Sequence, residues 1–166
     1  MQFNQPAIQL DKTTREKAWD AAGYTFYFGI LAYLYSIWKD LPDQVPTHYN
    51  VLGVIDQWGS KWELLIIPGT GLFMIIFMHF VWKYPHLHNY PKRLNDSNRK
   101  AFYLQSRQFI NQLKNIILIC LSLMLNEMIN NALGNTDRLS PWFMLIFILA
   151  ILMPIIHYFL KVRQIK

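Results

Sequence analysis

The sequence has little cysteine and little charge. Cys120 is the only cysteine, which excludes an internal disulfide framework and any Cys-rich zinc module. Charged residues make up 16% of the 166 residues, whereas soluble domains contain about 25%. Hydrophobic residues make up 53%. These shortages exclude a disulfide-stapled secreted domain and point to a membrane protein.

Four apolar blocks, each 18 or 19 residues long, contain almost no charged side chain, and they cover residues 21–38, 64–82, 115–133 and 142–160. A helix needs about 20 residues to cross the hydrocarbon core of a bilayer, and it satisfies its own backbone hydrogen bonds there. The sequence therefore predicts an all-α integral membrane protein, a four-transmembrane-helix bundle that forms one domain over residues 1–166. A soluble bundle is a poor alternative because the second and fourth blocks lack polar faces.

Lysine and arginine are distributed unevenly between the two ends of these blocks. Thirteen of the sixteen lie before residue 21, within residues 83–114 or after residue 160. By the positive-inside rule, both termini and the basic loop 83–114 are cytoplasmic, and the loop 39–63 is extracellular. The net charge of +6 is then a signal of orientation, so the lipid bilayer is an expected partner and nucleic acid is not.

Small residues recur along the first block at steps of four and three, at Ala18, Ala22, Thr25, Gly29, Ala32 and Ser36. This spacing keeps them on one helix face, and small residues let helix backbones approach closely in a bilayer. We expect this face to pack inside the bundle. A dedicated dimer interface is the alternative.

Glu127 is the only acidic residue within the four blocks. It lies on about half of the helix circumference together with Asn115, Ser122, Asn126, Asn130 and Asn131. A charge inside a span costs about 2.5–3.5 kcal/mol on insertion scales. Glu127 is therefore either an interfacial carboxylate that reaches water or bonds to Asn130 and Asn131, or part of an outward-facing pocket for a cationic or peptidic ligand, with Asn130 as a second candidate.

The loop 39–63 is expected to be ordered, because Pro42 and Pro46 stiffen its entry and glycines mark its turns. Residues 47–51 and 54–58 are predicted to form short extended arms. Six of its residues are candidates for binding a ligand: His48, Asn50, Asp56, Trp58, Ser60 and Lys61. The same loop could instead be a cap that seals the bundle, with Trp58 as an anchor and Asp56 pinning a turn through Lys61 or His48. Both interpretations stay open.

Residues 41–61 read Leu-Pro-x-x-Val-Pro-x-His-Tyr-Asn-x-x-Gly-x-x-Asp-x-Trp-Gly-Ser-Lys, and a proline, Pro68, follows near the start of the next block. Asn89-Tyr90-Pro91 forms a second motif, with Asn98 and Arg107 downstream. Over about residues 22–115 the sequence resembles the bacterial membrane proteins related to SdpI, the immunity and signal-transducing partner of the sporulation-delaying toxin. The resemblance includes the domain of unknown function at the N-terminal part of those proteins.

The resemblance implies a multi-pass protein of the bacterial inner membrane that gives immunity to, or senses, an extracellular peptide. It also implies signal transduction by holding a soluble regulator at the membrane. The loop 83–114 is then the candidate docking surface, with five candidate residues: Asn89, Tyr90, Pro91, Arg99 and Arg107.

No enzyme is predicted, because the sequence carries no phosphate-binding glycine loop, no His-Glu-x-x-His helix and no nucleophile elbow. One histidine among scattered acids is too little for a zinc site, so no metal or cofactor is expected. Two other functions stay open. One is an accessory or structural subunit that binds another membrane protein. The other, with less support, is a membrane enzyme or transporter that uses Glu127 and His48.

Overall fold

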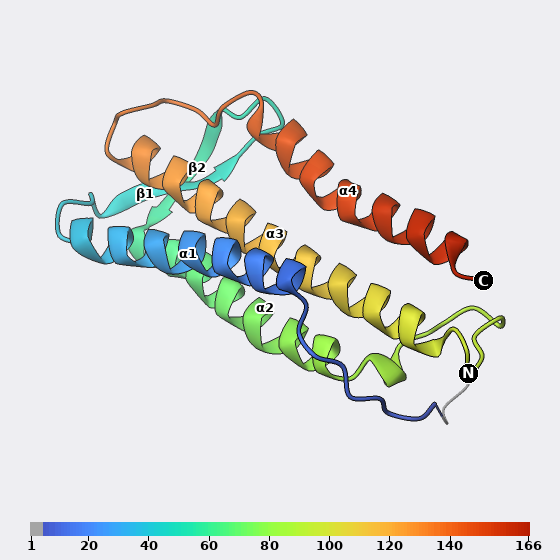
Figure 1. Ribbon diagram of the computed structural model, residues 1–166. Helices are drawn as coiled ribbons and strands as arrows, with labels where there is room; N and C mark the ends of the chain where they lie inside the picture. Colours follow the sequence, from blue (N-terminus) through green and yellow to red (C-terminus); the bar gives the residue numbers. More distant parts are fainter. Residues whose placement is uncertain (1–4) are drawn as a thin grey trace.

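The structure is a computed structural model that describes residues 5–166. Within these residues the chain forms four α-helices and one two-stranded sheet (Figure 1). In chain order the elements are α1 Thr14–Ile37, β1 Gln44–Tyr49, β2 Ile55–Ser60, the short 3-10 helix η1 Lys61–Leu65, α2 Ile66–Lys83, the 3-10 turn η2 Pro85–Leu87, α3 Arg99–Ala132 and α4 Phe143–Gln164.

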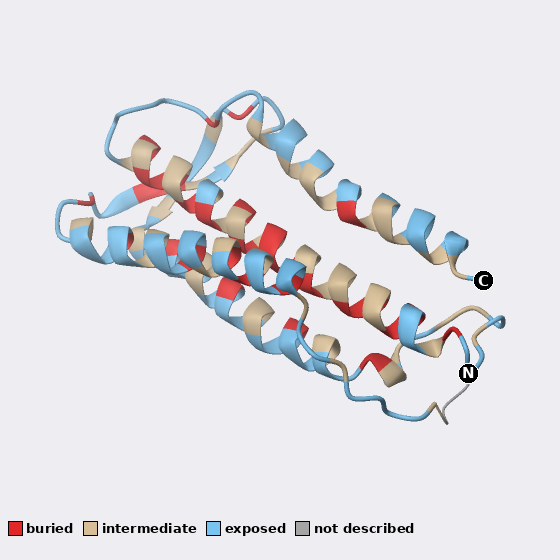
Figure 2. Cartoon of the chain, viewed as in Figure 1, coloured by how far each residue is buried: buried red, intermediate tan, exposed pale blue. Residues whose placement is uncertain are grey.

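The 34-residue helix α3 is the centre of the fold. Helices α1, α2 and α4 and strand β1 all pack against it. Most buried residues of the molecule lie on α3 and on the surfaces that face it, as Figure 2 shows. The predicted loop 83–114 is therefore wrong in its second half, which is helical from Arg99 onward. Residues 99–114 form a helix there because they have a face to bury, which includes Phe102, Tyr103 and Ser106.

Among residues 5–166, three helices are long and apolar enough to cross a membrane: the continuous stretch Lys61–Lys83, which joins η1 to α2, and the helices Arg99–Ala132 and Phe143–Gln164. They indicate a membrane protein. Helix α1 is less apolar because tyrosines interrupt its hydrophobic run and charged residues occupy its first turns. The prediction of an all-α fold is corrected in one respect: the fold is mostly helical but contains a two-stranded sheet.

Helix α4 packs mainly on α3 (Figure 1). It is exposed over much of its length (Figure 2), and most of its exposed side chains are apolar. One anchor is a stacked pair, Phe109 of α3 and Tyr158 of α4, with ring centroids 4.7 Å apart. Pro154, inside α4, is also buried. Such an outward apolar surface is what a lipid-facing helix presents.

The small-residue face of α1 does not pack inside the chain, so the expectation of bundle packing for that face is wrong. Of its members only Ala22 is half-buried; the others are exposed, namely Ala18, Thr25, Gly29, Ala32 and Ser36. The buried face of α1 instead carries Glu16, Asp20, Gly23, Tyr27 and Leu34. The Tyr27 hydroxyl donates a hydrogen bond to the carbonyl of Pro68 at 2.6 Å, which ties α1 to α2.

Candidate functional site

A β-hairpin joins α1 to α2. Its strands pair antiparallel from Gln44 opposite Ser60 to Tyr49 opposite Ile55. At the turn, the Asn50 side-chain oxygen accepts hydrogen bonds from the backbone N–H groups of Leu52 and Val54, at 2.9 and 3.1 Å. Gly53 has φ +76°, which favours glycine because a Cβ would clash in that conformation. The strands lie within three residues of the extended arms predicted at 47–51 and 54–58.

The hairpin is seated on one end of the bundle, called the hairpin end below. Buried residues of α1, of the segment just after it, of β1 and of η1 join residues of α3 in one hydrophobic core, made of Leu34, Leu41, Val45, Leu64, Leu125, Met128 and Ile129. The tip of the hairpin also contacts the connection between α3 and α4, because the N–H of Leu139 donates to the carbonyl of Gly53 at 2.8 Å. The hairpin is thus attached to the bundle on two sides.

Three of the six candidate residues in this loop have local structural partners. Asn50 holds the turn. Ser60 caps η1: its N–H donates to the Glu63 carboxylate at 3.0 Å, and its hydroxyl accepts from the N–H of Trp62 at 3.4 Å. Lys61 pairs with Asp43 at 3.2 Å, and its ammonium lies over the ring of Trp38. These contacts are those of a cap on the bundle.

The other three candidates are exposed, although two of them, His48 and Asp56, pair with each other as the cap interpretation expects. His48 Nδ1 lies 2.6 Å from Asp56 Oδ1 across the two strands, and the side chains are 64% and 42% exposed. Trp58 is 52% exposed. At the tip, Val51 and Leu52 are 94% and 75% exposed. The hairpin therefore presents a polar pair beside aromatic and aliphatic side chains that the bundle does not cover.

Tyr49 connects the hairpin to the polar face of α3. Its hydroxyl accepts a hydrogen bond from the Asn131 amide at 3.1 Å, and Thr136 donates to the other end of that amide at 2.8 Å. Burial raises the pKa of Tyr49. The Asn131 hydrogen bond acts in the opposite direction, and the carboxylate of Glu127 raises that pKa further. Glu127 is thus close enough to the hairpin to act on it electrostatically.

Glu127 lines a hollow of about 190 Å³ between α3 and the start of α4, which it shares with Asn126, Ser140, Phe143 and other residues. Within residues 5–166 its carboxylate forms no hydrogen bond and no ion pair, so it does not bond to Asn130 or Asn131. The Asn130 amide oxygen instead accepts from Asn135 at 3.3 Å, beyond the end of α3. Only one of the two predicted polar residues of α3 therefore lines a hollow.

The predicted docking surface of the loop 83–114 is wrong in one of its two arginines. Arg107 is 4% exposed and lies inside the bundle, so it is not available to a partner. Tyr90 is held in place by a hydrogen bond to the Pro85 carbonyl at 2.8 Å, and burial raises its pKa. Arg99 pairs with its neighbour Asp96, whereas Asn89 is exposed and Pro91 half-exposed.

Arg107 belongs to a buried cluster at the end of the bundle away from the hairpin, the opposite end. Its guanidinium donates to both carboxylate oxygens of Glu16, at 3.1 and 3.2 Å, and lies over the ring of Trp82. The indole N–H of Trp82 donates to the same carboxylate at 2.7 Å. One carboxylate thus joins α1, α2 and α3.

Asp20 is the second buried carboxylate of this cluster. Its Oδ1 accepts from Lys114 Nζ at 2.8 Å and from the amides of Asn111 and Asn115 at 2.7 and 2.8 Å. Lys12 pairs with its other oxygen. Burial acts to raise the pKa of Asp20, but the donors outweigh it and lower the pKa to about 2.

Arg107 is the only member of this cluster among the candidate residues predicted from the sequence, although the sequence contains a signal for the others. Glu16 and Asp20 are four residues apart, and Arg107, Asn111 and Lys114 follow a helical spacing. Two acids on one helix face and two bases on another can pair, but which helices meet is not a local property. Across residues 5–166, no three His, Cys, Asp or Glu side chains lie close enough together to hold a metal ion.

The apolar helices and this architecture define a mostly helical membrane protein with a small sheet between its first two long helices. The sequence profile of one protein family, described as Domain of unknown function (DUF1648), matches residues 25–72. The matched segment runs from α1 through the hairpin and η1 into α2. Comparison with curated proteins and with solved structures gave no match.

Proposed function

We propose that this chain is a non-catalytic immunity or sensing protein of the bacterial inner membrane that acts on an extracellular peptide. The observation that carries the proposal is the hairpin. It lies within the segment that matches the family profile, it is fastened to the bundle by its core residues, and it still exposes Trp58, Val51 and Leu52. A rigid scaffold that presents exposed loop residues is suited to recognition.

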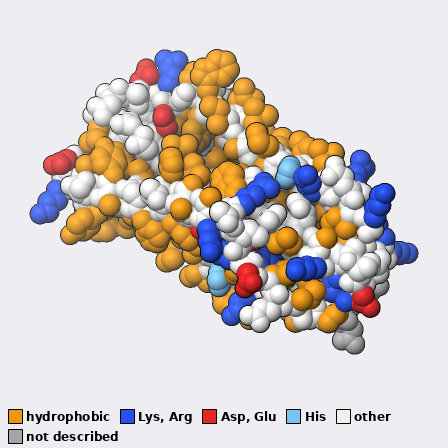
Figure 3. Space-filling view, viewed as in Figure 1, with side chains coloured by type: hydrophobic (Ala, Val, Ile, Leu, Met, Phe, Trp, Pro, Cys, Tyr) orange, Lys and Arg blue, Asp and Glu red, His pale blue; other side chains and the backbone are white. Residues whose placement is uncertain are grey.

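The proposal includes four membrane spans with both termini in the cytoplasm. Figure 3 supports this orientation, because lysine and arginine gather over the opposite end and are sparse at the hairpin end. Helix α1 runs beside α2 and α3 (Figure 1), and its 24 residues would extend about 36 Å. A helix of that length packed alongside two spans would cross the same bilayer.

On the cytoplasmic side, the proposed partner is a soluble regulator. With Arg107 inside the bundle, the docking surface would consist of exposed residues of the connection between α2 and α3 and the first turn of α3, Asn89, Lys92, Arg93 and Lys100. Binding at the hairpin would reach this surface through α3, which extends between the two ends.

The first experiment is deletion of the gene followed by challenge with a panel of cationic peptides. We expect deletion to increase sensitivity to at least one peptide and the wild-type gene to restore protection. The variants H48A and W58A should lose protection while the protein accumulates normally in the membrane. N50A is the comparison for the cap, because its turn hydrogen bonds make loss of accumulation the expected result.

An accessory subunit of a larger membrane complex is the second candidate. The exposed small-residue face of α1 favours it, since a Cβ placed on Gly29 would meet no atom within 4 Å. Such a face allows close approach of another membrane helix. Unchanged sensitivity to the whole peptide panel after deletion would argue against immunity and in favour of this role.

A further inference from the structure

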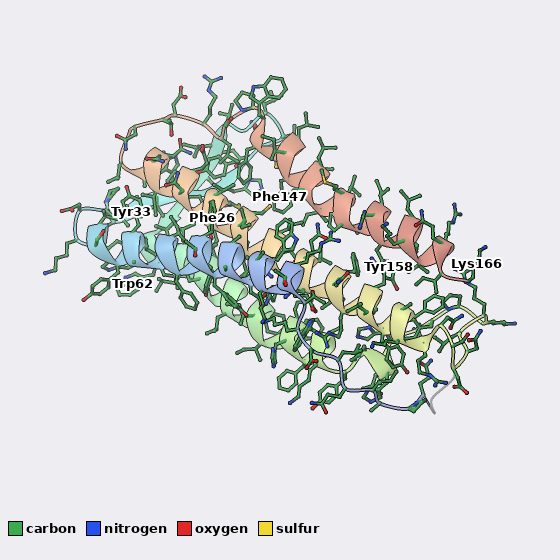
Figure 4. The ribbon with its side chains drawn as sticks, in the orientation of Figure 1. Phe26, Tyr33, Trp62, Phe147, Tyr158 and Lys166 are labelled. Carbon is green, nitrogen blue, oxygen red and sulfur yellow. The ribbon has the colours of Figure 1, made fainter. Side chains whose placement is uncertain are left out.

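Two hollows meet on the surface of α3 near the hairpin end. The first is the hollow of about 190 Å³ that contains Glu127. The second has a volume of about 380 Å³ and lies between α1 and α3. Leu123 and Asn126 line both, so the hollows adjoin. Figure 4 labels Phe26 and Tyr33 of α1 and Phe147 of α4 on the two sides of α3.

The two hollows differ in chemistry. The first combines the Glu127 carboxylate with the Ser140 hydroxyl and the stacked rings of Phe143 and Phe147, whose centroids are 6.2 Å apart. The second is lined mainly by apolar side chains, among them Phe26 and Ile30. Among residues 5–166, no lysine or arginine is found in the lining of either hollow. A carboxylate beside aromatic rings is a suitable environment for an ammonium ion.

Neither Glu127 nor Asn126 forms a side-chain hydrogen bond within residues 5–166, although both lie on a helix that could cross a membrane. Polar groups at such positions are costly unless they pair. A cationic group would pair with the Glu127 carboxylate, and an apolar part joined to that group would occupy the second hollow. A phospholipid headgroup fits less well, because its phosphate would lack a basic partner in the lining.

We propose that the joined hollows receive an apolar peptide segment that places one lysine ammonium against Glu127. The lysine head occupies the hollow between α3 and α4, and neighbouring apolar side chains occupy the groove between α1 and α3. This inference rests on the proposed function in taking the ligand to be a peptide that arrives at the hairpin end. It adds the chemical group that is recognised and the residue that recognises it.

The test uses the purified full chain in non-ionic micelles and two synthetic leucine-rich peptides that differ at one position, lysine or norleucine. The lysine peptide should raise the Tm of the wild-type protein by about 3–6 °C more than the norleucine peptide does. E127Q should abolish this difference. D40N is the matched control: it removes one exposed carboxylate near the same end, outside the hollow, and should keep the difference.

A second variant keeps the carboxylate and fills the junction of the hollows. L123W should also abolish the difference between the Tm shifts that the two peptides produce. This variant keeps the test decisive if E127Q folds poorly. Equal Tm shifts for the two peptides in the wild-type protein, or the same difference in E127Q, would overturn the proposal. A larger Glu127-dependent shift from dodecylphosphoethanolamine would overturn it in favour of a lipid headgroup.

Failure of this inference and failure of the proposed function are distinguishable. Peptide binding through Glu127 without any change in cellular sensitivity would leave this site intact and remove the immunity role. Protection that is lost in H48A and W58A but kept in E127Q would support the immunity role and remove the proposed site at Glu127.

Discussion

Asp20 is an aspartate held in its charged form inside the protein. It lies just before the predicted span 21–38, it is buried, and three nitrogen donors of α3 surround one of its oxygens. Within residues 5–166, the hydrogen-bond partners of the Lys114 ammonium are Asp20 and the hydroxyl of Tyr24. Removing either member of such a pair leaves the other as an uncompensated buried charge, which is strongly destabilising.

Replacing Asp20 should make the free energy of unfolding less dependent on pH in the acidic range. Its pKa falls from 3.8 to about 2 in the folded protein. A carboxylate with a lowered folded pKa stabilises above its unfolded pKa and loses that contribution as the pH falls through the folded value. We expect D20N to lose about 2–5 kcal/mol of unfolding free energy at pH 7. The difference in unfolding free energy between wild type and D20N should narrow between about pH 4 and pH 2, because the wild type loses the contribution of the Asp20 carboxylate there.

Thermal unfolding in micelles across that pH range measures the effect. D40N is the control, because Asp40 is exposed and forms no ion pair within residues 5–166. A constant difference between wild type and D20N from pH 7 to pH 2 would contradict the assignment of Asp20 as a buried ionised partner of Lys114.

At the scale of elements, two glycines of α1 lie on opposite sides of the question of packing: Gly23 is on its packed face and Gly29 on its exposed face. A Cβ on Gly23 would lie 2.2 Å from the Oδ1 of Asn115, and one on Gly29 would meet nothing within 4 Å. G23A should destabilise by about 1–3 kcal/mol, because overpacking forces the helices apart. G29A should be neutral or slightly stabilising, because alanine is the better helix former.

The measurement is the Tm of both variants in the same detergent. A drop for G29A that equals the drop for G23A would mean that the small-residue face of α1 is packed within the chain after all. The Tm of both variants should also be measured in native membranes. A drop for G29A that occurs there but not in detergent would indicate that another subunit packs on this face.

The elements differ in how much of them the sequence could predict. The prolines and glycines of residues 42–59 are local turn signals, so the two short strands are foreseeable to within three residues. The sequence does not predict the first half of α3, because its polar residues are typical of a cytoplasmic loop. Those residues form a helix because one face is buried in the bundle, where Arg107 and Lys114 pair with carboxylates on α1.

At the scale of the whole molecule, the proposed topology can be tested by labelling single cysteines. In a C120A background, V51C should react with a membrane-impermeant maleimide in intact cells, because Val51 is the most exposed residue of the hairpin tip. K17C and R163C should react only after permeabilisation. Labelling of K17C in intact cells would contradict a fourth span through α1, and labelling of R163C would contradict a cytoplasmic C-terminus.

The candidate site shows the same division between local and long-range information. Sequence spacing selects His48 and Asp56 as neighbours in one loop, and the strand register places them 2.6 Å apart. Sequence also marks Glu127 as unusual within an apolar block. It does not reveal that Glu127 faces Ser140 and Phe143 across a hollow, because that requires the position of α4 relative to α3.

The sequence by itself determined the features that depend on composition and local spacing: a membrane protein with long apolar helices, short extended segments within residues 39–63, and a strong imbalance of basic charge. The tertiary structure alone decided which face of α1 is buried, that Arg107 is an internal partner of Glu16, and that Glu127 lines a hollow between α3 and α4. The physical reason is that charge and amide pairing acts between helices distant in sequence. Because a buried charge without its partner is strongly destabilising, these pairs restrict which helix faces can meet.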